Sequence, residues 1–362
     1  MTLRRRGIQC LILAVATLAA VPTVAVGAGA SPLSKAGFNT RGDLLISDQF
    51  NNRAIEVNAV NKSIVWSFGS GDPTKCNPGP GAIIGLNDAE RLSDGLTLLA
   101  GTGIPAGASS FLPPGCVDNR VIVVDQTGSI VWQYGQAGVT GSGPNQLNVP
   151  VFAIQLPNHN IMIVDQGNNR VIEVDRTTKA VVWSYGPASG PGALNNPNSA
   201  ELLRNGHVLI ADENNNRVIE ITRSGAIAWQ YGSGSPTVTS PLQFAAFASR
   251  LQNGDTLITD SGHSRIVQVS EDKKVVFQYF TNTVANSNTS PLPTNAVRTR
   301  NGDISIADQF NHRAILIDDD GRLLQQVGET NVAGNGFDQL NGPYTSFVIG
   351  DYTGQTKPPR DF

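Results

Sequence analysis

Short runs of β-branched and aromatic residues, separated by polar turns, alternate along almost the whole chain of 362 residues. The stretch from Asn198 to Gly232 shows the pattern most clearly, with the runs NSAELL, HVLIAD, RVIEIT and AIAWQYG. An Asn-Gly turn, an Asn-rich loop and a Ser-Gly turn lie between them. Such runs, bounded by Gly and Asn, are typical of β-strands joined by tight turns. The segment therefore predicts a four-stranded meander.

The meander recurs, and each copy carries a marker: an aspartate, an Asn-rich loop, then an arginine followed by a β-branched run. Clear copies begin at Asp48, Asp165, Asp212, Asp260 and Asp308, and the degenerate copy is VDNRVIVVD. The marker arginines, spaced 47 to 67 residues apart, are Arg53, Arg120, Arg170, Arg217, Arg265 and Arg313. A period of 40–50 residues built from short strands is the signature of a propeller. We predict an all-β, six-bladed β-propeller of four-stranded blades over residues 31–352.

The blade count depends on the two ends of the repeat region. Six segments resemble the start of a first strand, and the earliest of them comprises residues 31–43. A further fragment, LNGPYTSFVIGDYTG, begins at Leu340. It either replaces or covers an inner strand where the ring closes, or it begins another blade. We predict six blades, with seven as the alternative, and a C-terminal tail at residues 353–362.

The repeat sequences resemble known propeller families. NGHVLIADENNNRVIEI and FNHRAILID are similar to NHL repeats, and the outer run AIAWQYG resembles quinoprotein-like and, more distantly, arylsulfotransferase-like repeats. The resemblance covers nearly all of residues 31–351. Members of these families include lyases, hydrolases and binding modules, so the resemblance implies the architecture and leaves the activity open.

The N-terminus has the features of an export signal. Three arginines at residues 4–6 precede an apolar run from Cys10 to Val26, and an Ala-x-Ala site ends at Ala30. This order predicts a signal peptide at residues 1–30 that is cleaved before Ser31. The apolar run is shorter than the ~20 residues that a membrane helix needs. We therefore expect a secreted or periplasmic protein without a stable membrane span, with an uncleaved anchor as the alternative.

The composition limits the classes of partner that the protein could bind. The formal net charge is −3 and only 15% of residues are charged, so no basic face for nucleic acid is evident. The four tryptophans all lie in the predicted outer strands, where we expect them to pack in the core rather than to bind ligands. We expect a monomer whose partner is an extracytoplasmic protein, a glycan or a small molecule.

Two cysteines remain after removal of the signal, Cys76 and Cys116. Cys76 lies between the fourth strand of one predicted blade and the first strand of the next, and Cys116 lies between strands two and three of that second blade. Both connections emerge on the same face of a propeller. An even pair in an oxidising compartment favours a disulfide, and we predict that the two are bonded.

The positions of the histidines argue against two enzymatic mechanisms that the resemblance implies. Amidating-lyase relatives bind zinc through histidines that converge on the channel, and arylsulfotransferase-like enzymes also need a channel histidine. No predicted inner strand of this chain contains one; the four histidines are His159, His207, His263 and His312. No nucleophile elbow, phosphate loop or Cys-pair zinc motif is present either. Whether the protein is an enzyme therefore stays open.

One enzymatic alternative remains, and it shares its location with the binding hypothesis. Gluconolactonase- and paraoxonase-like hydrolases resemble this architecture and hold calcium with Asn, Asp and Glu at the channel mouth. The alternative to such a metal site is a polar channel lined by water. Calcium is the only candidate cofactor, with Glu90, Glu201 and Asn198 as its candidate ligands.

The leading hypothesis is an exported recognition module that binds on its loop-rich face, flanked by an insertion from Gly101 to Cys116. The candidate ligand-binding residues are Asn87, Asp88, Asn198, Asn295 and His263. The marker arginines recur in every blade, so we expect them to pair with aspartates and serve the scaffold.

Overall fold

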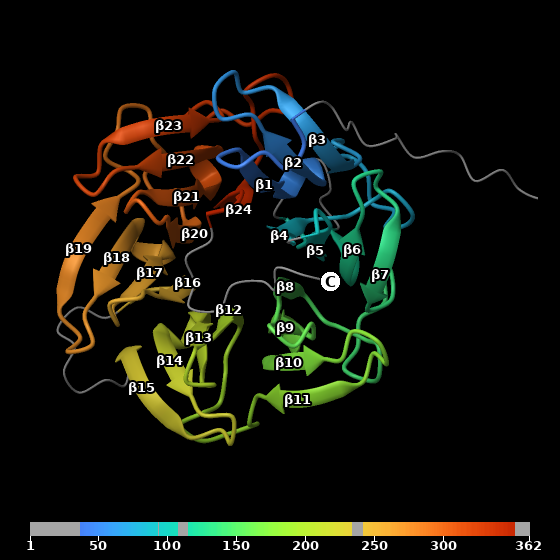
Figure 1. Cartoon of the computed structure of the whole chain (residues 1–362), viewed down its shortest axis with the longest axis vertical. Helices are drawn as coiled ribbons and strands as arrows, with labels where there is room; N and C mark the ends of the chain where they lie inside the picture. Colours follow the sequence, from blue (N-terminus) through green and yellow to red (C-terminus); the bar gives the residue numbers. More distant parts are fainter. Residues whose placement is uncertain (1–36, 93, 108–114, 234–241, 352–362) are drawn as a thin grey trace, which may run out of the picture.

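Six antiparallel sheets of four strands each stand around a central axis in the computed structural model (Figure 1). It describes residues 37–351 except 93, 108–114 and 234–241. The six-bladed, all-β propeller predicted from the repeats is confirmed. The only helical elements in the described ranges are five single 3-10 turns. The predicted signal peptide and C-terminal tail lie outside the described residues.

Within each blade the four strands follow one another from the channel outwards. Blades one and two contain β24 (Pro343–Val348), β1 (Leu44–Asp48), β2 (Arg53–Val57) and β3 (Ile64–Gly69), then β4 (Leu86–Arg91), β5 (Thr97–Ile104), β6 (Cys116–Val124) and β7 (Ile130–Tyr134). Blades three and four contain β8 (Pro150–Gln155), β9 (Ile161–Asp165), β10 (Arg170–Val174) and β11 (Val181–Tyr185), then β12 (Pro197–Leu202), β13 (Val208–Asp212), β14 (Arg217–Ile221) and β15 (Ile227–Gly232). Blades five and six contain β16 (Ala245–Arg250), β17 (Thr256–Asp260), β18 (Arg265–Val269) and β19 (Val275–Phe280), then β20 (Pro293–Arg298), β21 (Ile304–Asp308), β22 (Arg313–Ile317) and β23 (Leu323–Val327).

The 3-10 turns join the second and third strands of five blades. They are η1 (Gln49–Asn51), η2 (Gln166–Asn168), η3 (Glu213–Asn215), η4 (Ser261–His263) and η5 (Gln309–Asn311). In blade two the long β5–β6 connection takes the place of this turn. These connections lie on one face of the ring, together with the connections from each fourth strand to the next blade, and we call it the loop-rich face.

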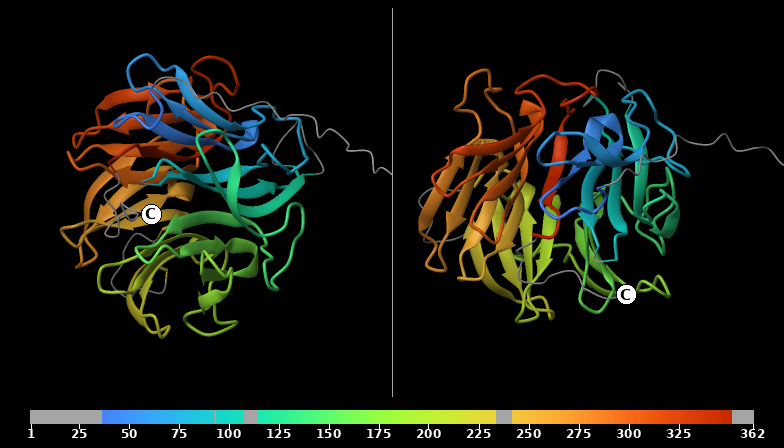
Figure 2. Two further views of the ribbon diagram at one scale, coloured as in Figure 1. Left: turned by 45° about the vertical axis from the view of Figure 1, so that its right-hand side comes forward. Right: turned by 45° about the horizontal axis from the view of Figure 1, so that its top comes forward.

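The ring closes through its C-terminal strand. Strand β24 pairs antiparallel with β1, so that red and blue segments share one sheet (Figures 1 and 2). The sequence pattern predicts the first strand of blade one within residues 31–43, and this prediction is wrong. Residues 37–43, the described part of that segment, form turns that lead into β1. The fragment from Leu340 therefore replaces an inner strand, one of the two possibilities that its sequence leaves open, and the two ends of the propeller share one sheet.

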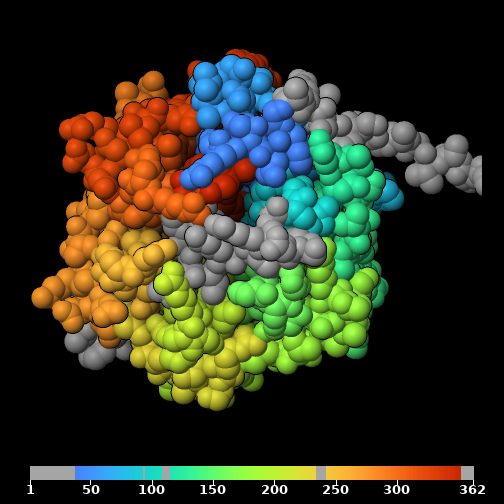
Figure 3. Space-filling model, viewed as in Figure 1, coloured from blue at the N-terminus to red at the C-terminus, as the bar shows by residue number. Residues whose placement is uncertain are grey.

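The core lies between blades, because neither face of a single four-stranded sheet could be buried by itself. Buried apolar side chains of neighbouring blades pack in shared clusters, such as Ile210 and Ile219 with Val164 and Val171. Adjacent blades are in contact around the visible side of the ring (Figure 3). The outer-strand tryptophans lie in the seams, where each indole donates to a backbone carbonyl of the next blade: Trp66 to Gln126, Trp132 to Arg176, Trp183 to Arg223 and Trp229 to Glu271.

Each of the inner strands β4, β8, β12, β16 and β20 has a register irregularity between its first and third residues. A bulge of this kind changes which side chains point into the channel. In the described part of the chain, no helix has the length and apolar character needed to cross a membrane.

Candidate functional site at the loop-rich face

Each marker aspartate connects separate parts of the loop-rich face. In blade four, Asp212 Oδ2 accepts hydrogen bonds from Asn215 Nδ2 at 2.8 Å and from Arg217 Nε at 2.7 Å. Asp212 Oδ1 accepts from the backbone N–H of Asn195, 2.8 Å away, in the connection that enters the blade. Arg217 also donates to two carbonyls of that connection. Asp212 is fully buried, so these groups bind other parts of the protein.

The arginine–aspartate pair recurs in every blade. Five further pairs have Nε–Oδ distances of 2.5–2.8 Å: Arg53–Asp48, Arg120–Asp118, Arg170–Asp165, Arg265–Asp260 and Arg313–Asp308. Burial raises the pKa of several of these carboxyl groups, and the arginine beside each acts in the opposite direction; they are Asp48, Asp118, Asp165 and Asp308.

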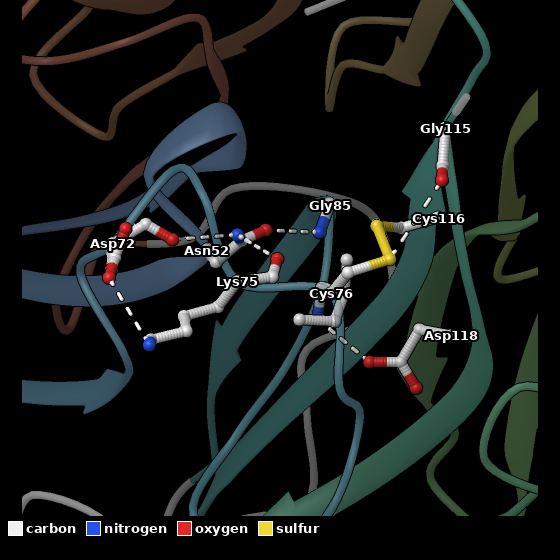
Figure 4. Close-up of a disulfide and its surroundings, with 9 residues drawn as sticks. Asn52, Asp72, Lys75, Cys76, Gly85, Gly115, Cys116 and Asp118 are labelled. Carbon is white, nitrogen blue, oxygen red and sulfur yellow. Dashed lines mark hydrogen bonds and ion pairs between the residues drawn. A yellow bond between two sulfur atoms is a disulfide. The ribbon is translucent and has the colours of Figure 1, made fainter. Parts of the chain in front are cut away.

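The last residue of the Asn-rich loop connects neighbouring blades. Asn52 Oδ1 accepts a hydrogen bond from the backbone N–H of Gly85, 2.8 Å away, at the entry to blade two (Figure 4). The same 2.8 Å bond joins the next pairs of blades: Asn119 to Val149, Asn169 to Asn196, and Asn216 to Phe244. Asn52, Asn169 and Asn216, which directly follow the 3-10 turns, have left-handed backbones, which asparagine tolerates better than most residues. Histidine replaces this Asn in blade six and serine replaces it in blade five.

Polar side chains bond to one another at the channel mouth on this face. Gln309 Nε2 donates to Gln49 Oε1 at 2.7 Å, and Gln49 Nε2 donates to Asn87 Oδ1 at 2.8 Å. On the other side, Asn198 Nδ2 lies 2.9 Å from the Tyr344 hydroxyl and donates to Glu213 Oε2 at 2.8 Å. These groups largely satisfy one another's hydrogen-bonding capacity.

Two of these mouth residues have perturbed acidities. Burial raises the pKa of the Glu213 carboxyl, although its hydrogen bonds from Asn198 and Gln166 oppose the shift. Burial and the nearby Glu213 carboxylate raise the pKa of Tyr344. At neutral pH the Tyr344 hydroxyl is therefore protonated and stays available as a donor within the network.

Two predicted site residues lie deeper in the channel than Asn87 and Asn198. Asp88 Oδ2 accepts from the backbone N–H of Ala153 at 3.1 Å, in the middle of β8. Asn295 Oδ1 accepts from the backbone N–H of Ser346 at 3.3 Å, in the middle of β24. Both Asp88 and Asn295 are fully buried. The structure thus divides the predicted set between the mouth and the interior.

Apolar side chains fill much of the channel beside these groups. The rings of Phe152 and Phe247, from blades three and five, meet edge to face with centroids 5.6 Å apart. Val297 and Phe347 belong to the same buried cluster. A channel packed in this way has the character of a core rather than of an open cleft.

The acidic residues of the inner strands influence one another within this interior. Burial raises the pKa of Asp88 to about 7. Burial, then the Asp88 and Glu201 carboxylates, raise the pKa of Glu90 well above its usual value. Glu201 Oε2 accepts from the backbone N–H of Arg250 at 2.8 Å, whereas Asn198 of the same strand bonds at the mouth.

The described residues contain no group of three or more His, Cys, Asp or Glu side chains placed to hold a metal ion. Of the predicted ligands Glu90, Glu201 and Asn198, the asparagine bonds Glu213 and Tyr344, while the two glutamates lie further along their strands. The remaining predicted site residue, His263, lies in η4, where its Nδ1 is 2.9 Å from Asp260 Oδ2. It occupies the position that Asn215 has in blade four, so its contact belongs to the marker network.

The predicted disulfide is confirmed and anchors the insertion on this face. Cys76 and Cys116 are bonded, with Cα atoms 5.5 Å apart (Figure 4). A cavity of about 400 Å³ lies next to the bond, between blades two and three. Its lining includes both cysteines, Thr102, Ile104, Val117 and Val149. Val117, with 42% of its surface exposed, lies at the edge of this cavity.

Sequence reasoning missed several mouth residues: Gln49, Gln166, Glu213, Gln309 and Tyr344. The signal was present, because the first four follow a marker aspartate directly. This position is Gln in blades one, three and six, Glu in blade four and Ser in blade five, whereas the marker Asp and Arg are constant. Tyr344 was missed because the sequence left its segment open between an inner strand at the closure and the start of another blade.

Comparisons with known proteins agree with this architecture. A solved structure of a protein of unknown function from Bacteroides caccae has a TM-score of 0.56 and 16% identity, covering 79% of this chain and 93% of that one. Virginiamycin B lyase from Staphylococcus aureus has a TM-score of 0.48 and 14% identity, covering 82% of this chain and 86% of that one. At 16% identity, the likeness to the Bacteroides caccae protein concerns the fold alone. No curated protein matches the chain.

A family match covers most of the sequence. Residues 31–307 match the PQQ_2 family, which is described as outer membrane protein assembly factor BamB. This supports the quinoprotein-like part of the resemblance, while the NHL assignment stays a prediction. Because the match spans more than half of the 362 residues, the chain belongs to this PQQ_2, BamB-like family of β-propellers.

Proposed function

We propose that this protein is an exported recognition module that binds an extracytoplasmic protein partner on its loop-rich face. The observation that carries the proposal is the cavity of about 400 Å³ beside the Cys76–Cys116 disulfide. Cavities of a few hundred Å³ suit an anchoring side chain of a partner. The description of the family as an assembly factor supports a protein as the partner, and the disulfide supports an oxidising compartment.

The surroundings of the cavity favour binding at the surface over chemistry in the channel. The mouth residues already bond to one another, so a substrate there would have to break the Gln49–Asn87 and Asn198–Glu213 contacts. The connections of the loop-rich face, in contrast, expose apolar side chains that a partner would bury. They include Val117, Val139, Phe244, Val284, Val332 and Phe337.

Photo-crosslinking in intact cells tests the proposal. A benzophenone amino acid replaces Val117 at the cavity or, as the control, Val60, which is 92% exposed in the β2–β3 connection on the opposite face. We expect position 117, and not position 60, to give a discrete adduct with another protein that mass spectrometry identifies. Val117→Asp should prevent recovery of the same complex, and Val60→Asp should not.

Two results would contradict the proposal. Adducts of equal yield at both positions, or none at position 117, would remove the loop-rich face as the binding surface. Stoichiometric calcium in the purified protein, lost with a chelator together with stability, would favour the metal-assisted hydrolase or lyase instead.

A further inference from the structure

A second cavity lies between blades five and six, on the face of the ring opposite the loop-rich face. Its volume is about 780 Å³, within the range of small-molecule sites. The lining combines apolar side chains (Leu251, Val276, Phe277) with two arginines, Arg298 and Arg300. The corresponding seams elsewhere show why this one is open.

Three other seams are closed by an arginine held between a glutamate and a tryptophan. Between blades four and five, Arg250 Nη2 donates to Glu220 Oε2 at 2.9 Å, and its guanidinium lies 4.9 Å from the Trp229 ring centroid. Between blades one and two, Arg91 makes the same contacts with Glu56, at 2.9 Å, and Trp66, at 4.9 Å. Between blades three and four, Arg223 pairs with Glu173 over Trp183. The arginine comes from the later blade each time.

The seam between blades five and six keeps the arginine but lacks both partners. Arg298 ends β20 as Arg250 ends β16. The glutamate position is Gln268 and the tryptophan position is Phe277, whose smaller ring centroid lies 5.5 Å from the guanidinium. Gln268 bonds away from the arginine, because its Nε2 donates to Asp255 Oδ2 at 2.6 Å. Among the described residues, no carboxylate of blade five therefore pairs with Arg298 as Glu220 pairs with Arg250.

The guanidinium of Arg298 keeps a donor without a partner as a result: its Nη2, the atom with which Arg250 donates to Glu220, makes no hydrogen bond to a described residue. Gln268 Oε1 is buried without a partner as well, whereas Arg298 Nε lacks one just as Arg91 Nε and Arg250 Nε do in the closed seams. Arg298 Nη1 turns to its own blade, to the Gly302 carbonyl at 2.5 Å and to the exposed Asp319 carboxylate. Leaving a polar group without a partner is unfavourable, so the Nη2 of this guanidinium is a vacant position for an acceptor.

We propose that this cavity binds a small organic monocarboxylate with an apolar body. The ligand carboxylate would accept from Nη2 of Arg298, as Glu220 accepts from Nη2 of Arg250, since guanidinium groups pair well with carboxylates. The apolar body would pack against Phe277, Val276 and Leu251. Asp255 and Asp319 also line the cavity, so a second carboxylate on the ligand would be repelled.

Blade three of the same chain shows a residue pair that would close the site. In blade three the residue before the second strand is Asn160, which donates to Glu173 at 2.7 Å. In blade five the same two positions hold Asp255 and Gln268, with the donor and the acceptor exchanged. The double variant Asp255→Asn/Gln268→Glu recreates the blade-three arrangement at unchanged net charge. Its new carboxylate would pair with Arg298 and take the place of the ligand.

Calorimetric titration with 3-phenylpropionate tests the inference, with 3-phenylpropionamide as the neutral analogue. We expect the intact protein to bind the acid at least tenfold more tightly than the amide. Both Arg298→Gln and the double variant should reduce affinity for the acid at least tenfold, and the double variant should unfold at an equal or higher temperature. Arg322→Gln, at a 74% exposed side chain in blade six, is the matched control and should bind like the parent.

Three outcomes would overturn the inference: no measurable binding of the acid to the intact protein, equal affinity for acid and amide, or unchanged affinity in a correctly folded double variant. Because this site lies on the face opposite the disulfide, these results are independent of the crosslinking at position 117.

Discussion

His312 Nδ1 accepts a hydrogen bond from the backbone N–H of Gly342, 3.1 Å away. Gly342 immediately precedes the strand that closes the ring, and His312 holds the position that Asn52 and Asn216 hold in their blades. The contact is therefore the interblade bond of the propeller at the seam between its last and first blades. Unlike asparagine, histidine loses its acceptor when it is protonated.

This difference predicts a pH-dependent contribution to stability. Burial lowers the pKa of His312, so the unfolded chain binds the proton more readily than the folded protein. The contribution is complete above the unfolded pKa of about 6.5 and is lost as the pH falls below it. His312→Asn keeps an acceptor that does not titrate in this range. Denaturation at pH 7.5 and pH 5 should show that the parent loses about 1 kcal/mol more stability than the variant, the size of one hydrogen bond. Equal losses would contradict the role of His312.

The repeat determined how much of the fold was predictable. Each blade carries its own Asp, Arg and turn residues, so the blade unit and its period could be recognised locally. The closing strand could not be assigned in this way, because the pairing of β24 with β1 joins segments about 300 residues apart and nothing local to either one specifies it. For that reason the repeat pattern placed the missing strand upstream of β1.

The site was predicted less well, and the reason is geometric. Inner strands such as β4, β12 and β20 have a bulge after the first residue. Because of it, side chains that point into and out of the channel do not alternate regularly. Asn87 and Asn198 consequently bond at the mouth, while Asp88 and Asn295 lie in the interior. Further hydrogen-bonding groups at the mouth come from the residues that follow the marker aspartates, such as Glu213. These residues lie inside the repeated motif, so the sequence pattern assigns them to the scaffold.

Asp88 should make the protein less stable as the pH rises. Burial raises its pKa to about 7, and its Oδ1 has no partner among the described residues. A carboxyl group with a raised folded pKa contributes stability that is complete below its unfolded pKa, near 4, and is lost as the pH rises through the folded pKa. Asp88→Asn should remove roughly 2–4 kcal/mol of the decline between pH 5 and pH 9. Denaturant titrations at both pH values measure it, with the exposed Asp320→Asn as a control that changes nothing. A decline that persists unchanged in Asp88→Asn would show that other groups cause it.

Arg217 should matter for stability because it holds a buried aspartate. Arg217→Ala leaves Asp212, which is fully buried, without the donor at 2.7 Å, and frees two carbonyls of the entering connection. We expect a loss of about 1–3 kcal/mol in the free energy of unfolding, the cost of an unsatisfied buried group. Urea denaturation measures the loss, and Arg322→Ala, at an exposed pair, should lose less than about 0.5 kcal/mol. A similar loss in both variants would indicate that the marker network contributes no more than a surface ion pair.

The disulfide should stabilise both the propeller and its loop-rich face. The bond joins residues 40 apart in sequence, and closing a loop of this length removes conformational freedom mainly from the unfolded chain. The double variant Cys76→Ser/Cys116→Ser should lose about 2–4 kcal/mol in the free energy of unfolding, yet keep the circular dichroism spectrum of a propeller, since Cys116 packs in a small cluster with Ile84 and Ile104 and not in the larger clusters between blades. Because Cys76 and Cys116 also line the cavity beside Val117, the crosslink from position 117 should weaken in the same variant, under conditions in which it remains folded. A variant as stable as the parent, with undiminished crosslinking, would show that the bond neither restrains the unfolded chain nor shapes the cavity. The reduced parent protein provides the internal comparison, because it should match the variant in stability.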